Sequence, residues 1–170
     1  MPSPSTPNTY PLQLPNPDIA DYEKGNTDIP WAFTFDSGKP GPHVMISAVV
    51  HGNELCGAIA LDWLLRENVR PVQGKLSLAF MNVAAYNSYT PGDPNASRFV
   101  DEDFNRVWSD QVLDGERDSV ELRRARQVRP LVDQVDLLLD IHSMQHPAIP
   151  LMMAGPLPKG RELAARVGTP

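Results

Sequence analysis

Apolar residues lie along the chain in three nearly continuous runs of strand length, at residues 43–50, 74–83 and 135–143. Continuous rather than alternating runs are typical of strands that are covered on both faces of a sheet. The alternating segment 31–38 ends in a Ser-Gly turn and predicts another strand. A shorter apolar run at 150–155 predicts one more.

Between these runs, the spacing of apolar residues predicts three helices, at residues 54–69, 117–128 and 157–168. In the first helix, Leu55, Ile59 and Trp63 fall on one stripe, and this stripe is widened by three neighbouring apolar residues, Ala58, Leu61 and Leu65. This wide apolar face predicts a deeply packed helix. Strands that alternate with helices indicate an α/β fold. We therefore predict a mixed, largely parallel central sheet flanked by helices.

Two segments lack either pattern. Six prolines fall within the first 17 residues, so residues 1–18 are expected to form an extended tail and order is expected to begin near Ile19. Residues 84–114 are rich in Pro, Gly, Asp and Asn, and so long a loop in a compact domain is usually functional or disordered. The rest, residues 19–170, is expected to be part of a single domain.

Composition narrows the class of protein. The net charge of −6, without a basic stripe, argues against nucleic acid as a general partner. A single cysteine, Cys56, excludes an intrachain disulfide and favours a reducing compartment. No run reaches the roughly 18 apolar residues that span a bilayer, and the N-terminus lacks the pattern of a signal peptide. We expect a cytoplasmic protein without a membrane partner, and the oligomeric state stays open.

Polar residues of the metal-binding type follow two of the predicted buried strands. His51 and Glu54 lie at the junction of a strand and a helix, and His142 ends another strand, with Asp140 on the same side. Ligand sites in α/β sheets cluster at the carboxyl ends of strands. If the two strands are parallel neighbours, His51, Glu54 and His142 converge. Two imidazoles and a carboxylate form the ligand set of some catalytic zinc sites.

Simpler interpretations exist for each residue alone. A histidine and a glutamate three residues apart occur by chance in many unrelated proteins. Glu54 could simply interact favourably with the dipole of the helix that it precedes. His146 could offer a rival ligand four residues after His142, although Pro147 disfavours a helix there. We interpret His146 as a pocket or surface residue, and His43 and Cys56 as structural residues.

The long loop contains the sequence SRFVDEDFNRVW at residues 97–108. Arg98 and Arg106 are fixed cations, and Asn105 carries an amide that can bond to a carboxylate or carbonyl. The three acidic residues at 101–103 could simply neutralise these arginines. Alternatively, one arginine binds a substrate carboxylate and the other polarises a carbonyl near a metal.

The segments HGNE, RFVDEDFNR and DIHS resemble, in order and spacing, the succinylglutamate desuccinylase/aspartoacylase family of zinc-dependent amidohydrolases. This family is related in fold to the zinc carboxypeptidases, and the likeness covers about residues 30–155. The resemblance implies that one zinc ion per chain is held by three ligands, His51, Glu54 and His142.

The same resemblance assigns further roles. Arg98 would polarise the scissile carbonyl, Asn105 and Arg106 would hold the carboxylate of an N-acyl amino acid, and Asp140 would support a zinc ligand. Members of the family carry a water-activating glutamate well after the last ligand. The only glutamate after His142 in this chain is Glu162, on a predicted helix. We therefore expect the chain to be the N-terminal part of a catalytic domain.

The function expected from the sequence is zinc-dependent hydrolysis of the amide or ester bond of small N-acyl amino acids. One alternative is a zinc carboxypeptidase that acts on peptides. Another is a fragment that binds metal or carboxylate without turnover. The sequence does not indicate which acyl group or amino acid is bound.

Overall fold

The computed structural model describes residues 14–144 and 146–168, so most of the predicted N-terminal tail lies outside the described residues. One sheet of four strands forms its centre: β1 (Ala32–Asp36), β2 (His43–Ala48), β3 (Lys75–Phe80) and β4 (Leu137–Ile141). The spatial order is β1-β3-β2-β4. The strand β1 runs antiparallel to β3, whereas β2 is parallel to both β3 and β4. The predicted mixed, largely parallel sheet is confirmed.

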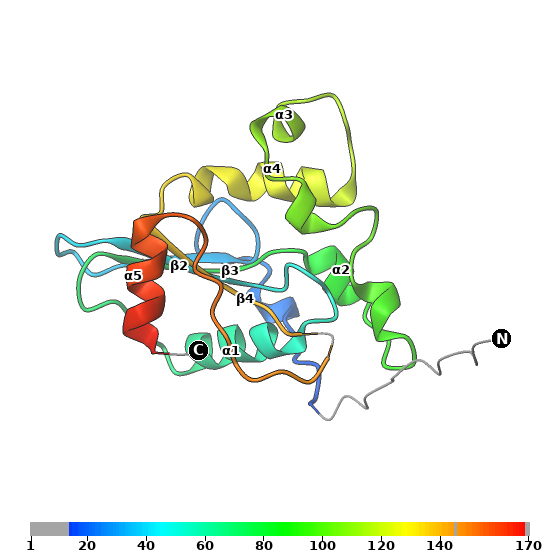
Figure 1. Cartoon of the computed structure of the whole chain (residues 1–170), viewed down its shortest axis with the longest axis horizontal. Helices are drawn as coiled ribbons and strands as arrows, with labels where there is room; N and C mark the ends of the chain where they lie inside the picture. The colour runs from blue at the N-terminus through cyan, green and yellow to red at the C-terminus, as the bar shows by residue number, and fades with distance from the viewer. Residues whose placement is uncertain (1–13, 145, 169–170) are drawn as a thin grey trace.

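Helices and short helical turns connect and flank these strands. The α-helices are α1 (Leu55–Arg66), α2 (Val83–Asn87), α3 (Asp110–Leu113), α4 (Val120–Val132) and α5 (Pro158–Val167). The 3-10 turns are η1 (Ala20–Tyr22), η2 (Pro94–Ser97) and η3 (Phe104–Arg106). Figure 1 shows α4 on one side of the sheet and α1 on the other. The fold therefore has three layers.

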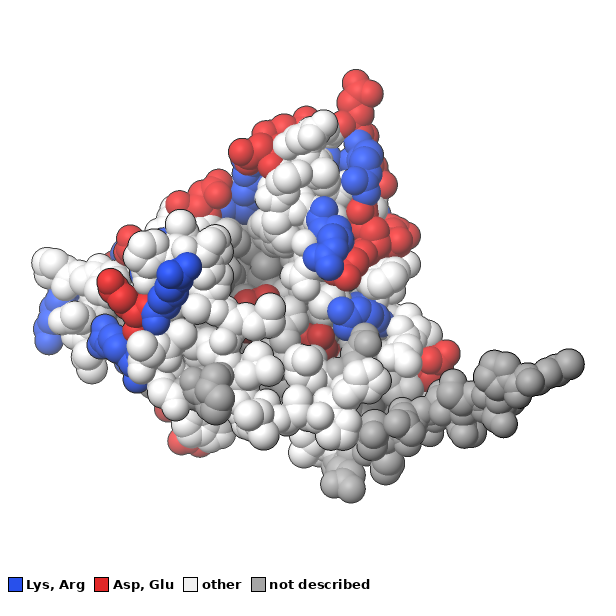
Figure 2. All heavy atoms as spheres, viewed as in Figure 1, with Lys and Arg blue, Asp and Glu red and all other residues white. Residues whose placement is uncertain are grey.

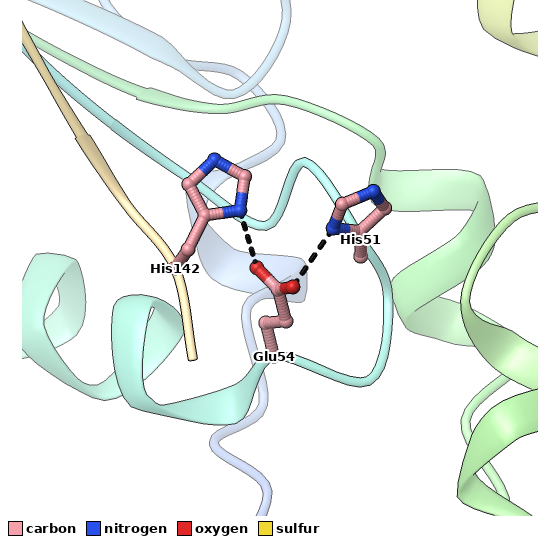
Figure 3. A group of neighbouring side chains, drawn as sticks. All are labelled: His51, Glu54 and His142. Atoms are coloured by element: carbon pink, nitrogen blue, oxygen red, sulfur yellow. Dashed lines mark hydrogen bonds and ion pairs between the residues drawn. The ribbon is translucent and has the colours of Figure 1, made fainter. Parts of the chain in front are cut away.

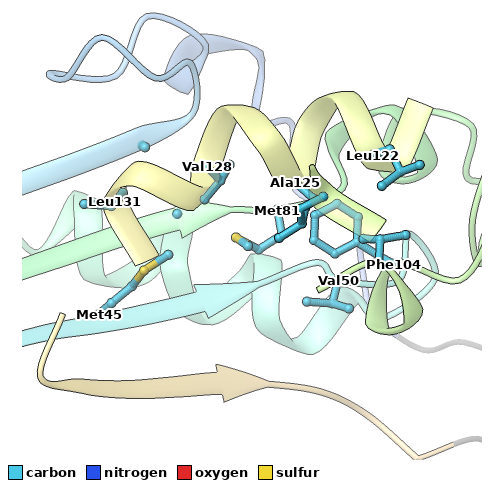
Figure 4. Close-up of a cluster of buried hydrophobic side chains, with 12 residues drawn as sticks. Met45, Val50, Met81, Phe104, Leu122, Ala125, Val128 and Leu131 are labelled. Carbon is cyan, nitrogen blue, oxygen red and sulfur yellow. The ribbon is translucent and has the colours of Figure 1, made fainter. Parts of the chain in front are cut away.

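Each face of the sheet has its own hydrophobic core. Between the sheet and α4, Met45, Met81 and Phe104 pack against the apolar face of the helix, which includes Leu122 and Val128 (Figure 4). On the other face, α1 packs against residues of β2 and β3 through Leu55, Ala58 and Leu61. Because both faces are covered, β2 and β3 can be continuously apolar, as their sequences predict.

Gly57 allows α1 to approach the sheet closely. A Cβ atom at this position would lie 2.7 Å from the Cβ atom of Ala48 and 3.1 Å from the carbonyl oxygen of Ile141. The helix therefore lies directly against the ends of β2 and β4. This contact fixes the start of α1 relative to both strands.

Three predictions about the fold are wrong in detail. Trp63 is 58 % exposed, because α1 buries only the part of its predicted apolar face that contains Leu55, Ala58 and Leu61. Residues 150–155 form no strand, since this run pairs with no neighbour in the described structure and Met153 is 87 % exposed. The predicted loop 84–114 contains most of α2 and all of α3, η2 and η3.

The strand β4 also differs from its predicted environment. It pairs only with β2 and forms one edge of the four-stranded sheet, and Leu138 is 45 % exposed. Its apolar sequence therefore is not matched by burial on both faces. No helix in the described ranges is long and apolar enough to cross a membrane.

Two leucine-to-alanine substitutions, one on α1 and one on β4, test the burial of these two elements. Leu61 is fully buried, so Leu61→Ala should lower the free energy of unfolding by about 2–5 kcal/mol. Leu138→Ala should cost less than about 1 kcal/mol, because this side chain is already half in water. Urea unfolding of both variants measures the difference, and equal losses would contradict the edge position of β4.

Candidate metal centre

The ends of two adjacent parallel strands bring the candidate ligands together. Ala48, the last residue of β2, pairs with Ile141, the last residue of β4. His142 follows β4 directly, and His51 lies three residues after β2. Glu54 immediately precedes α1, which starts at the same edge of the sheet. The strands β2 and β4 are therefore parallel neighbours, as the convergence of the candidate ligands requires.

The turn between β2 and α1 needs unusual backbone geometry. Val49 has φ 65°, in the left-handed region that β-branched residues rarely adopt. Gly52 follows His51 and approaches other backbone so closely that a Cβ atom would lie 2.3 Å from the carbonyl carbon of Ala85 and from the carbonyl oxygen of Ser97. Only glycine fits there. The tight turn keeps the His51 side chain next to the start of α1.

Both imidazoles point at the carboxylate of Glu54, one at each oxygen (Figure 3). His51 Nδ1 lies 2.8 Å from Oε1, and His142 Nδ1 lies 2.8 Å from Oε2. His51 and Glu54 are buried, whereas His142 keeps 33 % of its side chain exposed. The three side chains thus form a compact group that is open to solvent on the His142 side.

The outer nitrogen of each imidazole meets another carboxylate. His51 Nε2 lies 3.1 Å from Asp103 Oδ1, and His142 Nε2 lies 2.5 Å from Asp140 Oδ2. Ser47 on β2 in turn donates a hydrogen bond of 2.6 Å to Asp140. Carboxylates in this position fix the orientation and tautomer of ligand imidazoles. The sequence predicts for Asp103 only the neutralisation of nearby arginines, and its contact with His51 is seen only in the structure.

The charges of this group favour an added cation. Burial disfavours the ionised form of Glu54, but the contacts with His142 and His51 outweigh it and keep the pKa of Glu54 below its usual value. The contacts with Asp140 and then Glu54 raise the pKa of His142 to about 10. The carboxylates therefore stabilise positive charge where the two imidazoles meet.

The donor set fits a zinc ion. One ligand atom each from His51, Glu54 and His142 lies within 4.8 Å of the others, and these three are the one such cluster in the described ranges. Two neutral imidazole nitrogens and one carboxylate oxygen suit zinc, and three protein ligands leave a position for water or substrate. With the Nε2 atoms held by carboxylates, the Nδ1 atoms remain for the metal.

The structure brings Arg98 to this group but leaves Arg106 apart from it. Arg98 Nη1 lies 3.6 Å from Glu54 Oε1. Arg106 is exposed, and its guanidinium donates a hydrogen bond to the neighbouring carbonyl of Asn105. Asn105 and Asp140 both line a cleft of about 390 Å³ between the sheet and the α3–α4 segment. Figure 2 shows the surface hollowed below that segment.

The other candidates lie in structural positions. His43 starts β2, where its Nε2 atom lies 2.7 Å from the hydroxyl of Ser77, and His146 is exposed. Cys56 is half-buried; burial and the Glu54 carboxylate raise the pKa of its thiol, which disfavours a reactive thiolate.

Glu162 lies far from the ligand cluster. It is exposed on α5, and Lys159 of the same helix donates a hydrogen bond to the carbonyl of Asp136, which immediately precedes β4. His142 follows the other end of that strand. Figure 1 shows α5 beside the sheet on the side away from the start of α1.

Comparisons with known proteins agree with this arrangement. The model of the succinylglutamate desuccinylase/aspartoacylase catalytic domain matches residues 40–165. An aspartoacylase family protein from Mesorhizobium loti superposes with a TM-score of 0.60 at 24 % identity, over 82 % of this chain and 43 % of that protein. Succinylglutamate desuccinylase from Chromobacterium violaceum superposes with a TM-score of 0.52 at 20 % identity, over 66 % of this chain and 36 % of that enzyme.

These two structures share the fold, and the chain spans less than half the length of either. A comparison of the sequence with functionally curated proteins finds no match. The family model, in contrast, covers most of the chain and includes every candidate ligand. The chain therefore belongs to the succinylglutamate desuccinylase/aspartoacylase family.

Proposed function

We propose that this chain forms the zinc site and part of the substrate site of a hydrolase that cleaves the amide or ester bond of small N-acyl amino acids. The observation that carries the proposal is the convergence of His51, Glu54 and His142 within 4.8 Å. The family match and the fold shared with a succinylglutamate desuccinylase support the reaction class.

Each candidate residue of this chain has a separate role in the proposed reaction. A bound zinc ion supplies Lewis acidity toward a carbonyl and lowers the pKa of water. Arg98, beside Glu54, donates hydrogen bonds to the carbonyl oxygen as negative charge develops on it. Arg106 and Asn105 bind the substrate carboxylate, for which a guanidinium is well suited. Asp140 holds the imidazole of His142 in its orientation.

Hydrolysis also needs a base that accepts a proton from water, and the described residues offer no free candidate near the ligands. Glu162 lies at the wrong end of β4, and Asp140 is bonded to both His142 and Ser47. This observation favours a second candidate function for the 170-residue chain alone. It would bind the metal and the substrate carboxylate without rapid turnover.

The metal site itself can be tested by stoichiometry. We expect one zinc per chain, and His51→Ala or His142→Ala should abolish tight binding because each removes one of three protein ligands. His146→Ala is the matched control, since His146 is exposed and outside the ligand cluster. Metal analysis after dialysis measures the ratio. Full zinc content in both ligand variants would rule out the site.

The substrate assignment of Arg106 predicts a loss of binding. Zinc-loaded chain with Arg106→Ala should bind N-acetylaspartate more weakly by about 1.5–3 kcal/mol, the range for hydrogen bonds to charged groups. Arg161→Ala, on the exposed face of α5, removes a charge away from the site and should have no effect. Calorimetric titration compares the variants, and unchanged affinity without Arg106 would remove its assignment.

No carboxylate in the described ranges is placed to act as the base, which predicts slow turnover. Zinc-loaded chain should hydrolyse N-acetylaspartate and N-succinylglutamate poorly, because a positioned base is typically worth about 10²–10⁴ in rate. Glu162→Gln should leave that low rate unchanged. The measurement is release of the free amino acid. A rate typical of an enzyme that is lost in Glu162→Gln would show that Glu162 is the base.

A further inference from the structure

Glu121 is a buried carboxylate outside the ligand cluster. It lies in the first turn of α4, is 0 % exposed, and is followed by Leu122 in the apolar core of that helix. Burying a charged carboxylate is costly unless strong hydrogen bonds replace its water. An apolar residue would be the expected choice at such a position, so Glu121 requires an explanation.

Four N–H groups surround this carboxylate. Oε1 accepts hydrogen bonds from the backbone N–H of Val100 at 2.7 Å and from the side chain of Asn82 at 3.1 Å. Oε2 accepts from the backbone N–H groups of Asp101 at 3.0 Å and Glu102 at 3.3 Å. Burial alone would raise the pKa of Glu121, but these hydrogen bonds lower it, so the residue is ionised at neutral pH.

The three consecutive residues held by Glu121 connect two parts of the metal centre. Arg98 lies two positions before Val100, and its guanidinium is 3.6 Å from Glu54. Asp103 directly follows Glu102 and contacts the outer nitrogen of His51. Any shift of residues 100–102 would therefore move both the arginine and the carboxylate that supports His51.

These contacts are more than a cap on α4. Ser119 already caps the helix, since its hydroxyl accepts a hydrogen bond of 3.0 Å from the N–H of Leu122. Asp101 accepts another from the N–H of Val120, so the loop and the helix bind each other reciprocally. Asn82, two residues after β3, joins Glu121 to the segment that follows β2, because the backbone N–H of Asn82 donates a hydrogen bond to the carbonyl of Val49.

We propose that Glu121 is a positioning residue of the metal centre, which holds residues 100–102 so that Asp103 orients His51 and Arg98 stays beside Glu54. The inference rests on the proposed function only in taking His51, Glu54 and His142 as metal ligands. It does not depend on the substrate or on turnover.

The test is a zinc titration of the 170-residue chain against a chromophoric chelator. Glu121→Gln presents an amide NH₂ group to N–H donors, so the loop loses part of its anchor. We expect zinc binding about 10-fold weaker, in the range found when the group behind a ligand imidazole is changed. Ser119→Ala is the matched control, because it weakens the same helix without touching the loop.

A double variant separates positioning from a general loss of stability. If Glu121 acts largely through Asp103, the double variant Glu121→Gln with Asp103→Ala should bind zinc more tightly than the product of the two single losses predicts. Multiplying losses would overturn the proposal, as would an equal loss in Ser119→Ala. If circular dichroism shows Glu121→Gln to be unfolded, Glu121→Asp, which keeps the charge on a shorter side chain, replaces it with the same expected direction.

The outcomes also distinguish this inference from the proposed function. Zinc binding that survives in both His51→Ala and His142→Ala would remove the metal site itself. Zinc binding that needs those ligands but is unchanged by Glu121→Gln would leave the metal site in place and refute only the role of Glu121.

Discussion

The contact of two imidazoles, those of His51 and His142, with the buried carboxylate of Glu54 is the interaction on which the candidate site depends. Glu54 is placed by the start of α1, His51 by the tight turn after β2, and His142 by the end of β4. The three meet only because β2 and β4 are parallel neighbours whose last residues are paired. The close approach of α1 at Gly57 keeps the helix start against those strand ends. The sheet, the helix and the turn are each needed for the one cluster.

The charges around this cluster explain why a metal would bind there. Glu54, Asp103 and Asp140 supply three carboxylates around the two imidazoles. Arg98 is a fixed cation that lies beside one of them, Glu54. With neutral imidazoles the group has an excess of negative charge in a partly buried place, where electrostatic interactions are stronger than in water. A divalent cation would offset that excess. Positive charge on His142 offsets part of it in the chain alone.

The sequence could predict that the candidate ligands lie close together, because the two histidines follow strand ends. His51 and His142 each come after a recognisable apolar run, and parallel neighbours place such ends at the same edge. The alternation of strands and helices predicted the α/β fold, and the family resemblance agreed with it. The environment of β4 and of Trp63 could not be predicted, because hydropathy does not tell which strand lies at an edge or which stripe of a helix faces the sheet.

The contacts of Asp103 and Glu121 could not be predicted from the sequence. Asp103 and Glu121 look like ordinary acidic residues in a loop and a first helical turn, and their roles depend on contacts with residues 52 and about 20 positions away. Such long-range hydrogen bonds leave no periodic signal. Arg106, by contrast, was singled out by its motif, and the structure leaves it at the surface near Asn105.

X-ray absorption spectroscopy of the zinc-loaded chain tests the central claim most directly. The account predicts a first shell of nitrogen and oxygen at about 2.0–2.2 Å, with the outer-shell scattering of two imidazoles. It predicts no sulfur at about 2.3 Å, since Cys56 is not a ligand. A sulfur shell, or a shell of oxygen alone without imidazole scattering, would contradict the site formed by His51, Glu54 and His142.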